Sequence, residues 1–369
     1  MALFDEDRAR PEQRRPGSRA RTAGWWLLAI AVVIAGVFAS SPAPYVIEQP
    51  GPVYDTLGVA TTSDGDEVPL ISVPDETTYP TEGNLDLLTV SIVGNPQRQP
   101  SWLEIGGAML DDSRAVVPIE AVFPADLTQE ERDEQNQTLM VDSQQDAIAA
   151  ALVELGYDFP REVTIIGLLD DSAAEGQLEE GDVITAVNGE PMHDIASLRD
   201  AIQVNGAEPA DIEVDRDGET VDAVVTPRDQ DGTLLIGVGV TMQYEFPIDV
   251  QIQLDDVGGP SAGLMFALGI IDKLTPDAMT GGERIAGTGT IDSAGNVGPI
   301  GGIRQKMHGA VGAGADWMLA PASNCDEVVG NIPSGLEVFA VQTLDDAIDA
   351  IDVIAQGGDL DALPRCAAG

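Results

Sequence analysis

The chain has 369 residues, a length typical of two or three domains. Hydrophobic residues make up 43% and charged residues 22%, which favours packed cores and argues against wholesale disorder. The formal net charge is −45, and such a polyanion repels phosphate backbones, so no nucleic-acid partner is expected.

Lysine and histidine are scarce, and this argues against two classes of site. The chain has two lysines, Lys273 and Lys306, and two histidines. A Walker A loop needs Gly-Lys-Ser/Thr, but Leu274 follows Lys273 and Met307 follows Lys306. The sequence therefore holds neither a P-loop ATPase nor a three-histidine metal site, and we expect no metal or other cofactor.

The N-terminal segment predicts a membrane anchor. The first 21 residues contain six arginines and four acidic residues, and residues 25–39 are almost continuously apolar. A 19-residue helix here spans about 28 Å, close to the thickness of the hydrocarbon core. We predict a cytoplasmic tail over 1–22, a transmembrane helix over 23–42 and an extracytoplasmic body in a single-pass protein of the cell membrane.

A cleaved signal peptide, with its processing site near Ala39, is the alternative. Both interpretations place the body in an oxidising space, where Cys325 and Cys366 can pair. The spacing of the two cysteines is equally compatible with two buried free thiols, so the sequence leaves the pairing open.

The segment 45–156 has mixed α+β character. Pro, Gly, Thr and Val punctuate its first half, which indicates short strands and turns, and Leu85–Val93 is the clearest strand. Apolar residues recur at helical spacing over 127–155, and Gly156 follows as a C-cap. These are the two elements of the segment that the sequence predicts most clearly.

A module of about 75 residues, 157–231, follows. It combines small residues, a Gly-x-Leu step and Gly181-Asp-Val-Ile-Thr-Ala-Val-Asn-Gly189, whose last two residues suit a hairpin turn. This pattern resembles a bacterial PDZ domain of the kind attached to envelope proteases, which implies a β-barrel-like fold and peptide binding; an unrelated small β-domain is the alternative. The family's carboxylate-binding loop precedes the strand that begins here at Val163, but Tyr157–Glu162 offers no glycine cradle.

The strongest candidate for chemistry is a serine before an apolar helix. The chain reads Gly259-Pro260-Ser261-Ala262-Gly263, and Pro260 suits a first helical turn. Free amides at a helix N-terminus can bind an oxyanion, so Gly259, Pro260 and Ala262 are expected to border an oxyanion hole or substrate cleft. An ordinary turn that caps a core helix is the alternative.

Two downstream segments favour catalysis: Ala286-Gly-Thr288-Gly-Thr-Ile-Asp292 and Pro299-Ile-Gly-Gly-Ile-Arg-Gln-Lys306. Together with the serine turn they resemble the proteolytic domain of Lon-type serine proteases, which use a Ser-Lys dyad. The resemblance implies that Ser261 is the nucleophile, Lys306 the general base and Thr288 the residue that orients the lysine. A lysine acts as a base only when neutral, so burial must lower its pKa from about 10.4. A solvated surface lysine is the alternative.

The same resemblance extends upstream and implies the domain organisation. Met140-Val-Asp-Ser-Gln-Gln-Asp-Ala147 is similar to a Lon helix, and Phe246–Leu254 to the strand that leads into the serine. We therefore expect 45–156 and 232–356 to form one α+β protease domain, interrupted by the PDZ-like module and followed by a loose tail, 357–369. Two positions depart from the Lon pattern, since Gly258 replaces an aspartate and Thr290 a glutamate.

Taken whole, the chain resembles membrane-anchored bacterial PDZ/Lon-like serine proteases without an ATPase. The resemblance implies an ATP-independent endopeptidase that cleaves flexible or unfolded extracytoplasmic protein segments, with the PDZ module binding clients or gating access. It also implies protein or peptide substrates, membrane attachment and self-association into homo-oligomers. The alternative is a proteolytically inactive PDZ-based envelope adaptor or scaffold.

Overall fold

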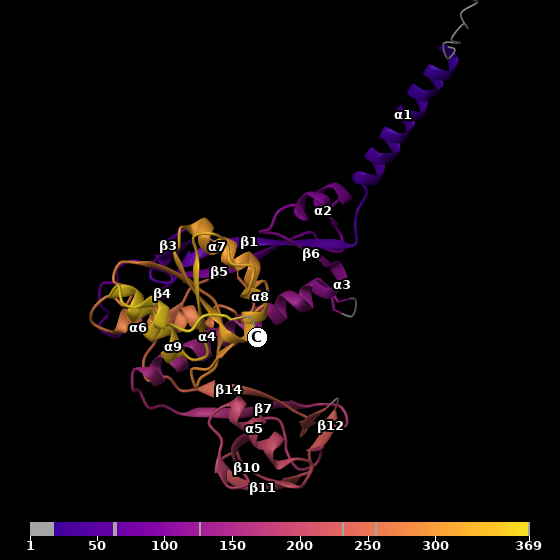
Figure 1. Ribbon diagram of the computed structural model, residues 1–369. Coiled ribbons are helices and arrows are strands. Elements are labelled where there is room, and N and C mark those ends of the chain that lie inside the picture. The colour runs from indigo at the N-terminus through magenta and orange to yellow at the C-terminus, as the bar shows by residue number, and fades with distance from the viewer. Residues whose placement is uncertain (1–17, 62–64, 125–126, 231, 255–256, 368–369) are drawn as a thin grey trace, which may run out of the picture. The chain divides into compact units, whose positions relative to one another are not determined.

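The computed structural model describes residues 18–61, 65–124, 127–230, 232–254 and 257–367, with side chains from residue 23 onward (Figure 1). The chain forms two compact units, Met1–Glu48 with Ile92–Pro124 and Gln49–Ser91 with Ala125–Gly369. Residues 1–17, which make up most of the expected cytoplasmic tail (1–22), lie outside the described residues.

The first unit contains helix α1 and a small core. Trp102 at the start of α2 stacks on Phe38 with ring centroids 5.8 Å apart, and Ser101 and Glu104 form a capping box for α2. Tyr45, at the start of β1, lies opposite Pro118 of β6. The elements are α1 (Ser18–Ala39), the N-terminal end of β1 (Tyr45–Asp55), α2 (Trp102–Ala108), β6 (Ala115–Pro118) and α3 (Ile119–Val122).

The transmembrane helix expected over 23–42 is not supported. Helix α1 ends at Ala39, where Ser40 and Ser41 fold back to donate hydrogen bonds to helical carbonyls. No helix within the described part of the chain combines the length and apolar character that crossing a membrane requires.

The second unit holds a largely parallel sheet with strand order β20-β19-β16-β5-β1. β16 pairs in parallel with β5 and β19, and β19 pairs in parallel with β20. Such strands are covered on both faces, and Leu85, Leu87 and Leu88 of β5 are accordingly buried. The strands are β5 (Asn84–Val93), β16 (Arg284–Gly287), β19 (Trp317–Pro321) and β20 (Glu337–Val341).

Four helices pack with this sheet. Apolar residues of three of them share one core, whose members between 57 and 87 and between 140 and 159 pack with members between 254 and 354, so the PDZ-like segment interrupts one packed body. The apolar residues of the fourth, 303–313, belong to a second buried cluster. The helices are α4 (Gln129–Glu154), α6 (Gly263–Leu274), α7 (Ile303–Ala313) and α9 (Leu344–Ala355). Shorter elements are β2 (Val59–Thr61), β3 (Glu67–Pro69), β4 (Ile71–Ser72), β15 (Gln251–Ile252), β17 (Thr290–Ile291), β18 (Val297–Gly298), η1 (Ala322–Asn324), α8 (Cys325–Val328) and η2 (Leu360–Ala362).

Two expectations for this body need correction. The segment 45–156 does not pack as one piece, because residues 92–124 belong to the first unit. The strand expected over 246–254 is reduced to β15, whose two residues pair with β4.

The PDZ-like segment forms its own sheet, with order β11-β10-β8-β7-β14, around a separate core (Figure 1). Its turn residues Asn188 and Gly189 have positive φ angles, as the hairpin signal predicts. The sheet continues past the boundary expected at 231, because β14 pairs with β7. β12 and β13 pair with each other in a separate two-stranded sheet. The elements are β7 (Arg161–Leu168), β8 (Val183–Val187), β9 (Glu190–Pro191), α5 (Ile195–Asn205), β10 (Ala210–Arg216), β11 (Glu219–Val225), β12 (Arg228–Gln230), β13 (Thr233–Leu235) and β14 (Val238–Tyr244).

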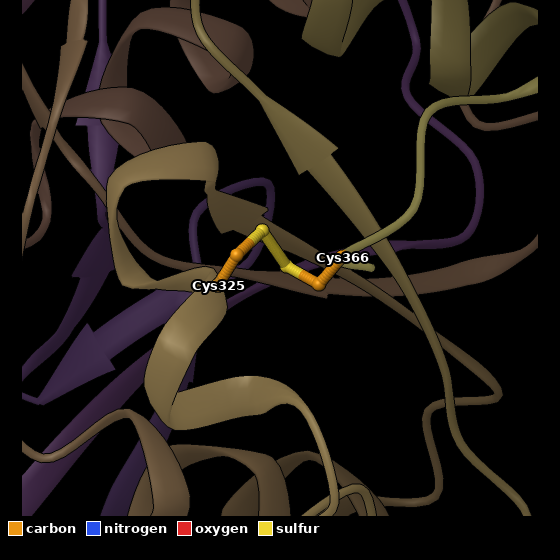
Figure 2. The surroundings of a disulfide bond; sticks show 2 residues. All are labelled: Cys325 and Cys366. Atoms are coloured by element: carbon orange, nitrogen blue, oxygen red, sulfur yellow. A yellow bond between two sulfur atoms is a disulfide. The ribbon is translucent and has the colours of Figure 1, made fainter. Parts of the chain in front are cut away.

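A disulfide between Cys325 and Cys366 answers the question that the cysteine spacing leaves open (Figure 2). It ties the last described residues to the start of α8, and the amide of Ala340 in β20 donates to the carbonyl of Pro364. The tail expected to be loose over 357–369 is therefore attached to the second unit through residue 366.

Candidate active site

The turn that carries Ser261 lies directly before α6. Gly259 has a φ of +85°, and its amide donates to the carbonyl of Asn136 at 3.0 Å. The helix begins at Gly263 after the N-cap Ala262, so Ser261 and Pro260 precede the first helical turn. Pro260 is therefore outside the helix that the sequence assigns it to, while Ser261 stays beside the free amides of the helix start.

Helix α4 holds this turn from the other side. The Ser143 hydroxyl, which is 3% exposed, donates to the carbonyl oxygen of Pro260 at 2.9 Å. A side chain at Gly263 would lie 2.9 Å from both Ser143 Oγ and Ile291 Cγ2, so only glycine allows this approach of α4, β17 and α6. The nucleophile turn is thus fixed by packing as well as by hydrogen bonds.

Thr288 follows the last residue of β16 and is fully buried. Its amide donates to the carbonyl of Leu319 in β19 at 3.2 Å, which fixes its backbone in the sheet. Its hydroxyl donates to the Ser261 carbonyl at 3.0 Å, and the amide of Gly289 donates to the same oxygen at 3.0 Å. The backbone of Ser261 is therefore held by two donors.

Lys306 reaches the site from α7. Its Nζ lies 2.8 Å from Ser261 Oγ and 2.8 Å from Thr288 Oγ1. The helix starts after Gly302, which is left-handed and so close to Val90 that an added Cβ would lie 2.7 Å from its Cγ2. Three segments far apart in the sequence thus bring a hydroxyl, an amine and a second hydroxyl into direct contact.

The environment of Lys306 favours a neutral amine. The residue is 2% exposed, and burial lowers the pKa of its amine to about 7 because the charged form loses its hydration. Ile303 and Met307, its neighbours in α7, belong to a buried apolar cluster together with Ile300. The neutral amine is therefore accessible near neutral pH.

The three residues expected at the oxyanion hole differ in what they can offer. Pro260 has no amide hydrogen, and the amide of Gly259 is engaged by Asn136. In the part of the chain that the structure describes, no hydrogen bond is recorded from the amides of Ser261 and Ala262. These two amides are the candidates for binding an oxyanion, and Gly259 is a turn-forming residue instead.

Asp146 is a residue near this site that the motifs do not mark. Tyr244 donates to its carboxylate at 2.5 Å, and burial raises the pKa of Asp146 to about 6. The sequence offers one indication that Asp146 lies near the site. Residue 146 follows residues 142 and 143 by four and three positions, so all three share one face of α4. Its contact with Tyr244, 98 residues later, has no signature in the sequence.

The PDZ-like segment has a groove of its own. Leu198 and Ile202 of α5 face the stretch Leu234–Val238 across a cavity of about 150 Å³. Gly237 in that stretch has a φ of +81°, and an added Cβ would lie 2.8 Å from Ser172. A glycine-containing stretch thus borders this groove directly before β14.

Comparison with known proteins finds a family model that matches a stretch of each part. Residues 253–353 match the family model of the Lon protease (S16) C-terminal proteolytic domain, and residues 167–216 match a PDZ domain model. Lon protease 2 of Herpetosiphon aurantiacus is 37% identical over 108 residues, 27% of this chain and 13% of that protein. Lon protease 1 of Sorangium cellulosum is 40% identical over 93 residues, 24% of this chain and 11% of that protein.

The chain therefore spans only about an eighth of the length of these relatives. The PDZ domain of an SdrC-like protein from Listeria innocua is 23% identical, with a TM-score of 0.21, and covers 21% of this chain and 92% of that chain. The corresponding domain from Listeria monocytogenes is 23% identical with a TM-score of 0.20, covering 21% and 85%. The chain contains a Lon-type proteolytic domain, consistent with a serine endopeptidase, and a PDZ domain.

Proposed function

We propose that the chain is an ATP-independent serine endopeptidase that cleaves flexible or unfolded protein segments with Ser261 and Lys306. The observation that carries the proposal is the contact of one buried amine with two hydroxyls, at 2.8 Å each. An inactive scaffold has no use for a desolvated amine beside a serine, and a buried lysine costs stability. No observation on the site favours the adaptor alternative.

The hydrogen bonds support a proton transfer from Ser261 to Lys306. Thr288 donates its only hydroxyl hydrogen to the Ser261 carbonyl, so its oxygen accepts from the amine of Lys306. A neutral amine that donates to Thr288 keeps its lone pair for the Ser261 hydroxyl. Thr288 is thus a positioning residue that aims the base.

Catalysis then follows the general scheme for an activated serine. Lys306 takes the Ser261 proton as Oγ attacks the substrate carbonyl, and the resulting ammonium gives a proton to the departing amine. Water then attacks the acyl-enzyme, Lys306 accepts a proton from it, and the Ser261 hydroxyl is restored as the acid product leaves. The amides of Ser261 and Ala262 stabilise the oxyanion of both tetrahedral intermediates.

Client selection is proposed to depend on the PDZ groove between α5 and Leu234–Val238. An apolar groove beside a strand suits an extended peptide that adds to the sheet. The chain carries no P-loop that could drive unfolding, so its substrates are segments that are already unfolded or flexible. Binding in the groove would raise the local concentration of such a segment or control its access to Ser261.

We further propose that the body works outside the cytoplasm and associates with a membrane through the apolar side chains of α1. The disulfide between Cys325 and Cys366 fits an oxidising compartment. The large apolar side chains of α1, including Trp25 and Trp26 at 68% exposure, offer a surface for lipid. Fractionation of cells that express the chain with and without residues 18–39 tests the attachment, and alkylation of its thiols tests the compartment.

The activity is tested by incubating the full chain, without ATP, with an unfolded protein and a quenched peptide library, and reading the products by mass spectrometry. We expect cleavage by the wild type and none by Ser261→Ala or Lys306→Met. Lys273→Met is the matched control, since it removes the other lysine and should leave cleavage intact. Cleavage that survives Ser261→Ala would refute the proposal, and a folded but silent wild type would favour the adaptor. Sedimentation of the same samples measures the self-association that the resemblance implies.

A further inference from the structure

A cavity of about 270 Å³ borders the nucleophile turn. Pro260 lines it on one side, directly before Ser261, and Ser143, which holds the Pro260 carbonyl, lines it too. Thr290 and Ile291 of β17 add a third wall. This volume lies just below the usual range for ligand pockets, about 300–1,000 Å³, so it suits one long side chain better than a whole small molecule.

The cavity is acidic. Asp142 and Asp146 of α4 line it one helical turn apart, and among its lining residues in the described chain there is no lysine, arginine or histidine. Tyr244 donates to Oδ1 of Asp146, and the described residues supply no hydrogen bond to the other oxygen. A partly buried carboxylate with a free oxygen and no cation beside it gains when a cation arrives.

Apolar walls complete the cavity. Leu139, Met242 and Ile291 line it, and Ile291 is 5% exposed. Lysine and arginine carry three or four methylene groups below their charge, and such stems pack favourably along apolar surface. The walls and the carboxylates therefore match the two halves of a basic side chain.

We propose that this cavity, the acidic pocket, receives an arginine or lysine side chain of the substrate close to the scissile bond, with Asp146 as the specificity-determining residue. The inference rests on the proposed endopeptidase function and names its substrate class. Asp142, which is more exposed than Asp146, adds attraction for the incoming cation. The oxygen of Asp146 that Tyr244 leaves free accepts from the basic head group.

Binding is measured first, because it does not depend on cleavage. The full chain with Ser261→Ala is titrated into fluorescent peptides in which one arginine is moved through a neutral sequence, and each peptide has a twin with citrulline in its place. Citrulline keeps the shape of arginine and lacks its charge. At one or more positions we expect the arginine peptide to bind at least about tenfold more tightly than its twin.

Two further variants test whether Asp146 causes the preference for arginine over citrulline. Asp146→Asn, which keeps an oxygen to accept from Tyr244, should reduce the preference to less than about twofold. Asp349→Asn removes an exposed carboxylate of α9 and the same formal charge, and should leave the preference unchanged. Equal binding of all twins to the Ser261→Ala chain, or a preference that persists in Asp146→Asn, would overturn the proposal.

Cleavage of the same peptides by the wild type separates this proposal from the proposed function. Arginine-selective binding without cleavage would retain the pocket and refute the peptidase. Cleavage with no preference for arginine over citrulline would retain the peptidase and overturn the pocket.

The arginine peptide and its citrulline twin depend in the same way on the ionisation of Lys306. This dependence therefore cancels when the kcat/KM of one is divided by that of the other. The ratio should fall towards one as the pH drops through about 6, where Asp146 gains a proton. Asp142, Asp292 and Tyr244 are the other titratable groups that act on this carboxyl. A ratio that stays constant from pH 8 to pH 5 would count against Asp146, and the Asp146→Asn ratio should be flat.

Discussion

The two lysines of the chain lie in different surroundings. Lys273, in the last turn of α6, is half-buried and donates to the carbonyl of Leu57 at 3.3 Å. Burial lowers the pKa of its amine, but the carboxylates of Asp272 and Asp55 oppose this. Lys306 is almost fully buried, and burial is what lowers the pKa of its amine, to about 7.

Burial alone therefore does not make a lysine into a base. A carboxylate beside Lys273 stabilises the ammonium form, whereas the hydroxyls of Ser261 and Thr288 beside Lys306 stabilise neither form strongly. A general base needs desolvation without a counter-charge, and of these two sites only the one in α7 meets that condition.

Removing each amine in turn is the sharpest test of this difference. Lys306→Met should lower kcat/KM by about 10³-fold or more, since loss of a member of a serine catalytic unit has effects of this size or larger. Lys273→Met should retain activity within about threefold of the wild type. Both are measured with one quenched peptide, with circular dichroism to verify folding. Equal losses in the two variants would show that the difference in surroundings is irrelevant.

The same variants should differ in stability. The folded-state pKa of Lys306, about 7, lies below its ordinary 10.5, so holding the amine costs stability at every pH below about 10.5, and the cost is complete below pH 7. Lys306→Met should raise the free energy of unfolding at pH 7 by on the order of 2–4 kcal/mol, and the gain should shrink as the pH approaches 10.5. Urea titrations at several pH values measure it. A gain that is independent of pH would show that the amine is not desolvated.

Thr288 tests how precisely the base must be aimed. Thr288→Val keeps the shape but removes the acceptor for Lys306 and the donor for the Ser261 carbonyl. We expect kcat to fall by about 10- to 100-fold, with a smaller change in KM, because such a loss corresponds to one or two hydrogen bonds. Thr288→Ser restores the hydroxyl and should recover most of the rate. Failure of serine to rescue would indicate a packing role.

The smallest of these effects is the pH profile of the wild type. Since the neutral amine is the base, kcat/KM should fall about tenfold per pH unit below pH 7 and level off above it. Lys273→Met should have the same profile as the wild type. A midpoint near pH 10 instead would mean that Lys306 is not the titrating base.

The structure brings together Ser261, Thr288 and Lys306, the residues that the motifs pick out, whereas the residues around them have little signal in the sequence. Ser261, Thr288 and Lys306 stand in short glycine-rich segments whose composition is dictated by close backbone approach, so a single sequence is enough to pick them out. Asp146 and Tyr244 meet only because β14 is added to the edge of the PDZ-like sheet. The pairing of β14 with β7 joins strands that are far apart in the sequence. The charged stretch that precedes β14 has the composition of a linker.

In the N-terminal region, the sequence predicts single elements correctly but not which of them pack together. The strand Leu85–Val93 and the helix over 127–155 are found almost residue for residue, as β5 and α4, because each has a strong local pattern. The assignment of 92–124 to a separate unit depends on which segments share a core, with Ile47 and Ile105 packed together. Local periodicity carries no information about such a choice.

The long separation between β5 and β16 has a consequence for biosynthesis. Asn84 and Arg284 are paired neighbours, but 200 residues separate them, and the whole PDZ-like sheet lies between them. Because a chain emerges from the ribosome N-terminus first, all strands of the PDZ-like sheet are made while β5 still lacks β16. Ser261 meets Lys306 only after α7 has been made, so the contact between the serine and the lysine is completed late in synthesis.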